Sequence, residues 1–258
     1  MKNVVFDNLV IGEGTPKICV PIVAAGKEEA VMQAEELLDS VADLIEFRGD
    51  YFGGDIHPEE MIKVIGEIRK RVQRPVIYTF RTGREGGRRE ISKAAYIELL
   101  RAVILSGEPE LVDIELMTGE EVKELISLAK DRQVRVIMSN HDFEKTPSEA
   151  ELVGRLQAME AMGADIAKIA VMPQDMCDVS RLLQATAEAV QKVEIPIVTM
   201  AMGQKGVISR ILGEVFGSSI TFGTLEQASA PGQLPVQQLA KLLEKIHQIS
   251  DLQMDKER

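Results

Sequence analysis

A lysine in an otherwise apolar run is the residue best suited to chemistry in this sequence. Lys168 lies in DIAKIAVMP, whose small and β-branched residues are typical of a buried strand. Lysine is rarely buried without a reason, and its neutral amine can attack a ketone to form a Schiff base that withdraws electrons from the adjacent carbon. A structural alternative is an ion pair with Glu46 or Glu115. A lysine can be ion-paired in the resting protein and still act as a nucleophile during catalysis. Lys168 is therefore the first candidate for covalent catalysis.

His141, in the run MSNHDF, is the second candidate. It is one of three histidines and is the one expected at the carboxyl end of a strand, where a proton shuttle that works near neutral pH would lie. A histidine in this place can also simply hydrogen-bond a core carbonyl. The expected position of Lys168 on the next strand favours the catalytic interpretation. We assign no catalytic role to His57, which precedes a proline, or to His247, in the final helical segment.

Further polar side chains fall on the same face of the expected strands as Lys168. Side chains alternate between the two faces of a strand, so residues two apart share a face. The inward-facing polar set is Glu46, Arg48, Thr79, Arg81, Asp113, Glu115, Ser139, His141 and Lys168. Barrel interiors are normally apolar, so charges at the carboxyl ends of strands indicate a catalytic face. The alternative is a set of satisfied ion pairs, which would be a costly way to stabilise a core.

These residues belong to a regular alternation of short β-branched runs and longer helical segments. The expected strands are Ile18–Val23, Asp43–Arg48, Val76–Arg81, Leu111–Leu116, Val134–Ser139, Asp165–Val171, Ile195–Met200 and Ser218–Gly223. The expected helices are Lys27–Leu38, Glu59–Val72, Ser92–Leu105, Glu120–Lys130, Ser148–Met162, Asp178–Lys192, Val207–Leu212 and Val236–Ile249. About eight strand–helix units predict an α/β fold of the (β/α)8 TIM-barrel type.

The whole chain, residues 1–258, is expected to form one catalytic domain, because no Pro/Ser-rich linker interrupts the alternation. Residues Met1–Gly14 contain two short β-like runs around Asn8 and predict a β-hairpin that closes the barrel floor. The last residues, Asp251–Arg258, have the composition of a frayed tail.

Charge and composition exclude several classes of function. The formal net charge is -11 and the sequence pI is about 4.9, which argues against a nucleic-acid or anionic-membrane partner. No segment has the run of about 20 apolar residues that a membrane span needs, and the first residues lack the apolar stretch of a secretory signal. Cys19 and Cys177 lie far apart without C-x-x-C spacing. We expect a soluble cytoplasmic protein without a metal or another cofactor.

Several short motifs follow one another along the chain. They are EFR at Glu46–Arg48, FRTGREGG at Phe80–Gly87, DIEL at Asp113–Leu116, SNHD at Ser139–Asp142, KIA at Lys168–Ala170, MAMGQKGVISR at Met200–Arg210, FG at Phe222–Gly223 and QASAPGQ at Gln227–Gln233. Each motif alone is weak evidence. In this order, over nearly the whole chain, the sequence resembles the type I 3-dehydroquinate dehydratases.

The resemblance implies a role for each matched residue. Lys168 would condense with the substrate ketone, His141 would move the proton, and Glu85 would orient and charge the imidazole. Arg210 would pair with the substrate carboxylate, a task that suits a guanidinium fork. The hydroxyl-binding set would be Glu46, Arg48 and Arg81, and the apolar walls would be Met200, Met202, Phe222 and Ala230. Ser229 and Gln233 lie in the loop Thr224–Pro235, which would close over the site.

The activity implied by the resemblance is the dehydration of 3-dehydroquinate to 3-dehydroshikimate, a step of the shikimate route to aromatic amino acids. Its substrate is a small cyclic hydroxy-keto carboxylate, and the resemblance also implies a homodimer. Two alternatives stay open from the residues alone. A buried strand lysine is equally suited to a Schiff-base aldolase on the same barrel, and a non-catalytic binding barrel could retain the same pocket.

Overall fold

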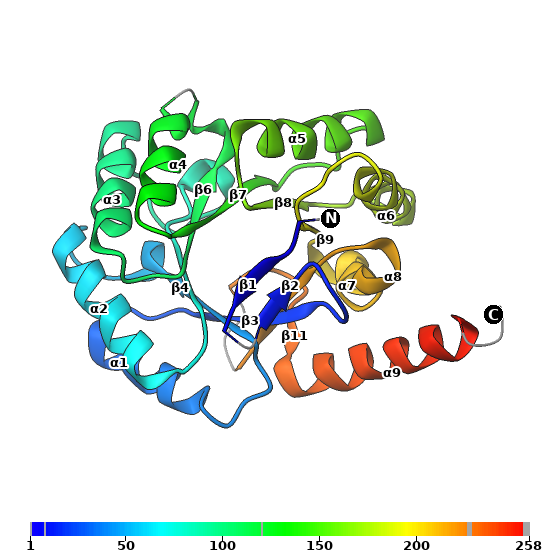
Figure 1. The fold of residues 1–258 in the computed structure, drawn as a ribbon, viewed down its shortest axis with the longest axis horizontal. Helices are drawn as coiled ribbons and strands as arrows, with labels where there is room; N and C mark the ends of the chain where they lie inside the picture. The colour runs from blue at the N-terminus through cyan, green and yellow to red at the C-terminus, as the bar shows by residue number, and fades with distance from the viewer. Residues whose placement is uncertain (1, 8, 120, 226–228, 255–258) are drawn as a thin grey trace.

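Parallel strands form a curled sheet that closes into a barrel, and helices surround it (Figure 1). The computed structural model describes residues 2–7, 9–119, 121–225 and 229–254. The barrel strands are β3 (Lys17–Ile22), β4 (Leu44–Arg48), β5 (Val76–Thr79), β6 (Leu111–Glu115), β7 (Arg135–Asp142), β8 (Ile166–Val171), β9 (Ile197–Ala201) and β10 (Ile220–Thr224). From β3 to β9 each strand pairs with the next along the chain, and β10 returns to pair with β3. The expected TIM barrel is confirmed.

The barrel closes between β9 and β10 by fewer contacts than elsewhere. In the described residues, one bridge joins Ile197 to Ser218, and the Ser219 amide donates to the Ile197 carbonyl at 2.8 Å. A short strand, β11 (Leu234–Pro235), pairs with the outer end of β10. It is too short to show a period in the sequence, and it was not expected. It ties the end of the loop after β10 to the barrel.

The helices lie where the sequence pattern puts them, and most ends agree within two residues. They are α1 (Lys27–Glu36), α2 (Pro58–Arg71), α3 (Lys93–Ser106), α4 (Val122–Asp131), α5 (Glu149–Met162), α6 (Met176–Val190), α7 (Gly203–Ile211), α8 (Gly213–Phe216) and α9 (Val236–Met254). However, α7 begins four residues earlier and α9 ends five residues later than expected. Side-chain caps explain several starts: the Ser92 and Ser148 hydroxyls accept the amides of Ala95 and Glu151. The four-residue α8 was not expected, because the predicted helix in this region ended at Leu212.

Buried side chains form two groups, one on each face of the sheet. Ile45, Phe47, Tyr78 and Phe80 lie in the group between sheet and helices, as the alternation predicts. The second group fills the lower barrel and includes Leu44, Ile77, Leu111, Ile137, Ile166, Val198 and Ile220. On β4 to β8, each of these lies two residues before a polar inward position on the same strand. The interior is therefore apolar at the amino ends of the strands and polar towards their carboxyl ends.

The predicted hairpin is present and covers the apolar end of the barrel (Figure 1). Strands β1 (Val4–Phe6) and β2 (Leu9–Ile11) pair antiparallel, with Val4 opposite Ile11. Both of these side chains are buried in the same group as Leu44 of the barrel interior. The hairpin thus closes the floor, as predicted from residues 1–14.

Helix α9 extends beyond the barrel towards the carboxyl terminus (Figure 1). It continues to Met254, four residues into the stretch Asp251–Arg258 that was expected as a frayed tail. The remaining tail residues, 255–258, lie outside the described part. Among the described residues, no helix combines the length and hydropathy that crossing a membrane would require.

Candidate active site

A cavity lies at the polar end of the barrel. Every residue predicted for the site lines it: Glu46, Arg48, Arg81, Glu85, His141, Lys168, Met200, Met202, Arg210, Phe222, Ser229, Ala230 and Gln233. Gly86, Phe143 and Ala170 complete the lining. Residues spread from β4 to β11 are therefore brought together in one place.

Lys168 points into the cavity from the middle of β8 and is 5% exposed. Its Nζ lies 3.4 Å from Asp113 Oδ2 and 3.7 Å from Glu46 Oε1. The amine also lies 4.5 Å from the centre of the Phe222 ring. Of the two ion-pair partners considered from the sequence, Glu46 is present. Glu115 was the wrong alternative, because it accepts from Arg81, and Asp113 pairs with the lysine in its place.

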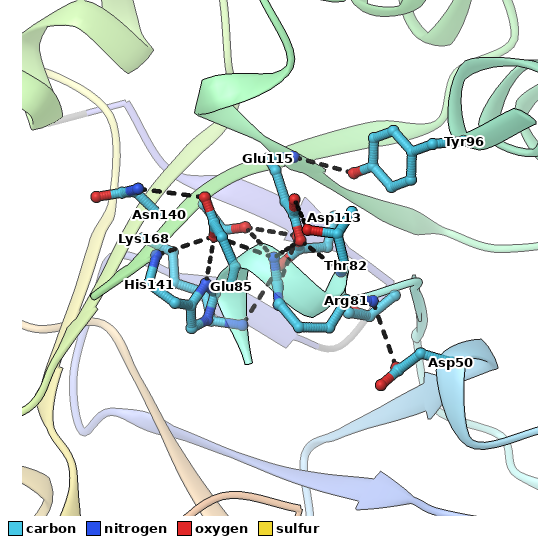
Figure 2. A network of polar contacts seen from close by, with 12 residues as sticks. Asp50, Arg81, Thr82, Glu85, Tyr96, Asp113, Glu115, Asn140, His141 and Lys168 are labelled. Carbon is cyan, nitrogen blue, oxygen red and sulfur yellow. Dashed lines mark hydrogen bonds and ion pairs between the residues drawn. The ribbon is translucent and has the colours of Figure 1, made fainter. Parts of the chain in front are cut away.

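His141 and Glu85 form a hydrogen-bonded pair beside the lysine strand (Figure 2). The imidazole Nδ1 lies 2.9 Å from Glu85 Oε2, and the His141 backbone amide donates to the same oxygen at 2.9 Å. Strand β7 continues to Asp142, three residues past its expected end, and pairs with β8 throughout. This extension keeps His141 inward, two residues after Ser139, which is the partner of Lys168 in the sheet.

Burial controls the protonation of this pair. Burial raises the pKa of Glu85 to about 8, against the opposing charge of Arg81. Burial, together with the nearby cations Arg81 and Lys168, holds the pKa of His141 well below its ordinary value. The imidazole is therefore neutral near neutral pH. A neutral imidazole in a cavity can accept a proton.

A tight turn after β5 carries Glu85 to the imidazole. The amides of Glu85 and Gly87 both donate to the Thr82 carbonyl, at 3.0 and 2.8 Å. Gly86 has a φ of 80°, in the left-handed region that favours glycine. A Cβ on Gly87 would lie 1.8 Å from the Arg81 carbonyl oxygen, so only glycine fits. The two glycines of the FRTGREGG motif thus shape the turn that positions the carboxylate.

Arg81 is the centre of a satisfied ion network (Figure 2). Its guanidinium contacts Asp113 at 2.9 Å, Glu115 at 3.0 Å and the Ser139 hydroxyl at 2.9 Å. Burial lowers the pKa of Arg81, but the neighbouring carboxylates outweigh burial and raise it above the ordinary value. The inward-facing charged residues of β5 and β6 therefore form ion pairs with one another. This agrees with the structural alternative for the polar set, which was a group of satisfied ion pairs. They hold Arg81 and Lys168 in fixed positions at the cavity wall.

Arg48 is held by a carboxylate that the sequence did not single out. Asp50 lies two residues later in the 3-10 turn Gly49–Tyr51 and accepts two bonds from the Arg48 guanidinium, both at 2.8 Å. The remaining Arg48 nitrogen donates to the Ser229 carbonyl at 3.4 Å. The pair links β4 to the loop after β10. The two parallel hydrogen bonds to Asp50 fix the orientation of the Arg48 guanidinium at the cavity wall.

Arg210 differs from the other buried cations because, among the described residues, no carboxylate pairs with it. The side chain is 1% exposed. One nitrogen donates to the Pro231 carbonyl at 3.2 Å, another lies 3.5 Å from the Met200 sulfur, and Nε has no partner. Burial lowers the pKa of Arg210 to about 10, so the guanidinium still carries its charge at neutral pH. A buried, uncompensated guanidinium at a cavity wall is a site for an anion.

The rest of the wall comes from β9, β10 and the loop that follows. Met200, Met202 and Phe222 are buried and apolar. Ser229 and Gln233 bond each other twice: the Ser229 amide donates to Gln233 Oε1 at 2.8 Å, and Gln233 Nε2 donates to Ser229 Oγ at 3.0 Å. The expected closing loop, Thr224–Pro235, is described except for residues 226–228.

Sequence reasoning missed several residues around the cavity. Asn140 donates to Glu85 Oε1 at 3.2 Å, although strand alternation places it on the outer face of β7. Its position beside His141 in the SNHD motif was the available signal. Asp50 could have been found as an acid two residues after an inward arginine. Nothing in the sequence singled out Phe143, which lies against Gly86 at the mouth.

Comparisons with known proteins agree along nearly the whole chain. A family model described as Type I 3-dehydroquinase matches residues 18–250. The 3-dehydroquinate dehydratase of Listeria monocytogenes is 45% identical over 251 residues, which cover 96% of this chain and 99% of that protein. The crystal structure of type I 3-dehydroquinate dehydratase from Clostridium difficile, solved with covalently modified comenic acid, superposes with a TM-score of 0.92 at 43% identity, covering 96% of this chain and 98% of that one. The 3-dehydroquinate dehydratase of Geobacillus kaustophilus has a TM-score of 0.93 at 36% identity, covering 96% and 97%.

Proposed function

Because this chain belongs to the type I 3-dehydroquinase family, we propose that it is a hydro-lyase that converts 3-dehydroquinate to 3-dehydroshikimate through a Schiff base on Lys168. The observation that carries the proposal is one cavity lined by a buried amine, a neutral imidazole and a guanidinium that has no carboxylate partner among the described residues. An amine, a base and an anion clamp are the groups that dehydration of a keto acid needs.

The first step is the attachment of the substrate to Lys168. The amine adds to the ketone carbon, and the carbonyl oxygen leaves as water. One proton taken up from solvent in this step leaves the imine protonated, and it is returned when the imine is hydrolysed at the end. Asp113 and Glu46, at 3.4 and 3.7 Å from Nζ, lie close enough to stabilise the positive charge of the iminium once it has formed. The iminium withdraws electrons from the neighbouring carbon, so its proton becomes easier to remove.

His141 then serves as base and acid in turn. It takes the proton from the carbon next to the iminium, and the electron pair moves to form an enamine. The enamine expels the hydroxyl on the following carbon, and His141 returns its proton to that oxygen, so that water leaves. Hydrolysis of the remaining imine consumes one water and releases the conjugated enone and free Lys168. The sum is the loss of one water from the substrate.

Glu85 determines which imidazole nitrogen is free for this role. When Glu85 is ionised, Nδ1 donates its hydrogen to Oε2 and Nε2 keeps its lone pair for the substrate. When the pair holds one more proton, Nε2 carries a hydrogen and cannot accept another. With the pKa of Glu85 raised to about 8, turnover should rise with pH through that value.

The remaining side chains bind and orient the substrate in this proposal. Arg210 takes the carboxylate, because it is buried and charged and lacks an anionic partner among the described residues. Glu46, Arg48 and Arg81 bind hydroxyls, and the apolar wall packs on the ring. Ser229 and Gln233 belong to the loop that closes the cavity, which would keep bulk water from the imine. The shikimate route, a cytoplasmic location and a homodimer are part of the same proposal.

The proposal is tested with the purified protein and 3-dehydroquinate. We expect growth of the ultraviolet absorbance of a conjugated enone, and no growth with a Lys168→Ala variant. If 3-dehydroquinate gives no absorbance change while a phosphorylated keto sugar is cleaved, the protein is a Schiff-base aldolase. Binding of 3-dehydroquinate without turnover of either compound would identify a non-catalytic barrel.

A further inference from the structure

A chain of polar contacts runs from Glu85 to the outer surface of α5. Asn140 Nδ2 donates to Glu85 Oε1 at 3.2 Å, and Asn140 Oδ1 accepts a 2.5 Å hydrogen bond from Arg155. Arg155 lies on α5 and also pairs with Glu151, one turn earlier on the same helix. Asn140 is buried, whereas the Arg155 side chain is 23% exposed. The chain therefore connects the cavity to a surface helix by way of one buried amide.

We infer that Asn140 and Arg155 are positioning residues, which act through Glu85 to keep the His141 imidazole in its base-competent form. The inference rests on the proposed dehydration and extends it to the helix side of β7. Neither residue lines the cavity, so neither is expected to touch the substrate.

The two carboxylate oxygens of Glu85 have different partners, and this difference gives Asn140 its importance. Oε2 faces the His141 imidazole and amide, and Arg81 lies 3.5 Å from it. Among the described residues, Oε1 has one hydrogen-bond donor, which is Asn140. A buried carboxylate oxygen that loses its donor loses the stabilisation of its ionised form.

Arg155 determines which end of the Asn140 amide faces Glu85. An amide can rotate and present either its oxygen or its NH₂ group, but a guanidinium offers only donors. Arg155 therefore holds the Asn140 oxygen towards α5 and the NH₂ group towards Glu85. Without Arg155 the amide can turn and accept a hydrogen bond from protonated Glu85, which favours the protonated carboxyl group. Both substitutions thus act in the same direction.

The charged groups around Glu85 set the sign of the expected effect. From β5 Arg81 favours the ionised carboxylate, whereas Asp113 and Glu115 of β6 oppose it. Across the pair lies His141 of β7, which burial and the cations Arg81, Lys168 and Arg48 keep neutral. The Asn140 bond lowers the pKa of Glu85 within this set. Its loss should raise that pKa, and turnover should then begin to rise at a higher pH.

The experiment measures kcat and KM against pH for the wild type, Arg155→Met, Arg155→Lys, Asn140→Ala and the double variant Asn140→Ala/Arg155→Met. We expect Arg155→Met to move the acid limb of kcat upward by about 0.5–1 pH unit, the size that one hydrogen bond allows. Below the limb, kcat should fall about three- to tenfold with KM little changed. Arg155→Lys keeps a donor and should recover most of the wild-type profile.

The double variant separates positioning from a general loss of structure. Adding Arg155→Met to Asn140→Ala should cause no further shift, because Arg155 acts through Asn140. The matched control is Arg101→Met, which breaks a surface ion pair of α3 with Glu124 and should keep the wild-type profile. If Asn140→Ala does not fold, the comparison of Met with Lys at position 155 decides alone.

Superimposable profiles for Arg155→Met and the wild type would overturn the inference, as would a full Arg155→Met effect in the Asn140→Ala background. These outcomes are distinct from a failure of the proposed function. An inactive wild type with 3-dehydroquinate would refute that function, whereas an active wild type with insensitive variants refutes only the roles of Asn140 and Arg155.

Discussion

Buried cations around the cavity differ in their partners more than in their burial. Arg81 contacts Asp113, Glu115 and Ser139, so its charge is compensated within the protein. Arg210 is as deeply buried, but within the described part of the chain its side chain contacts a carbonyl oxygen and a sulfur and no carboxylate. Burial of a charge without a counter-charge is costly. We therefore interpret Arg81 as a compensated charge that serves only neutral hydroxyls, and Arg210 as the charge kept for the carboxylate of the ligand.

This difference predicts the behaviour of an Arg210→Met variant. Loss of a charge-assisted fork to a carboxylate should raise KM for 3-dehydroquinate by roughly a hundredfold, since about 3 kcal/mol of binding is removed. The unliganded protein should not lose thermal stability, because the substitution removes an uncompensated buried charge. Steady-state kinetics and thermal denaturation measure both effects.

The outcome that would count against this role is a KM within twofold of the wild type. A lower melting temperature of unliganded Arg210→Met would contradict the interpretation of Arg210 as a buried charge without a counter-charge. Arg132→Met is a suitable control, because Arg132 is exposed at the end of α4 and away from the cavity. It should change neither quantity.

At the scale of the elements, each barrel strand contributes to stability near its amino end and to the proposed chemistry near its carboxyl end. Inward residues near the amino ends are apolar and pack on the β1–β2 hairpin, whereas inward residues near the carboxyl ends line the cavity. Ile11 of β2 is fully buried in this lower group, while Val5 of β1 is 55% exposed. The hairpin should therefore stabilise the barrel without contributing to turnover.

Ile11→Ala tests this division. Removing a buried isoleucine side chain should lower the free energy of unfolding by about 2–5 kcal/mol. The kcat of the folded fraction should stay at the wild-type value, because the floor lies at the opposite end of the barrel. Urea denaturation and steady-state kinetics give the two numbers, and Val5→Ala is the matched control on the same hairpin. A fall in kcat at saturating substrate would show that the floor influences the site.

The element pattern could be predicted because two signals agree in this sequence. Runs such as Ile166–Val171 are too short and too β-branched for helices, and serine caps begin α3 and α5. The predicted end of β7, at Ser139, was three residues too early, and this error has a physical reason. Asn140, His141 and Asp142 are polar and resemble a loop, but pairing with β8 extends the strand over them. Tertiary contacts decided that boundary, and one sequence alone does not show them.

For the whole molecule, the order of motifs predicted which residues belong to the site better than it predicted the contacts between those residues. Every residue predicted for the site lines the cavity. Strand alternation and strand ends predicted Glu46, Arg48, Arg81, His141 and Lys168. The other site residues, such as Glu85 and Arg210, came from the resemblance to the family. Alternation assigns a face but not a partner. It therefore left open whether Lys168 pairs with Glu46 or Glu115, and it did not show the contact of Asn140 with Glu85. Those contacts depend on side-chain reach across neighbouring strands.

The charge of the molecule as a whole fits this arrangement. The chain carries a formal net charge of -11, so its surface does not favour polyanions. A small anion can still bind, because Arg210 supplies an uncompensated positive charge inside the cavity. The protein thus combines an acidic surface with a cationic point at the place where a carboxylate would bind.

The central claim is that the Lys168 amine becomes covalently attached to the substrate, and borohydride reduction tests it most directly. The protein is mixed with 3-dehydroquinate, reduced with borohydride and digested. The mass of the peptide that contains Lys168 is then measured by mass spectrometry. We predict that this peptide gains the mass of the reduced adduct, and that His141→Ala still gives the adduct while turnover collapses. An unmodified Lys168 in wild-type protein that is turning over substrate would contradict the account.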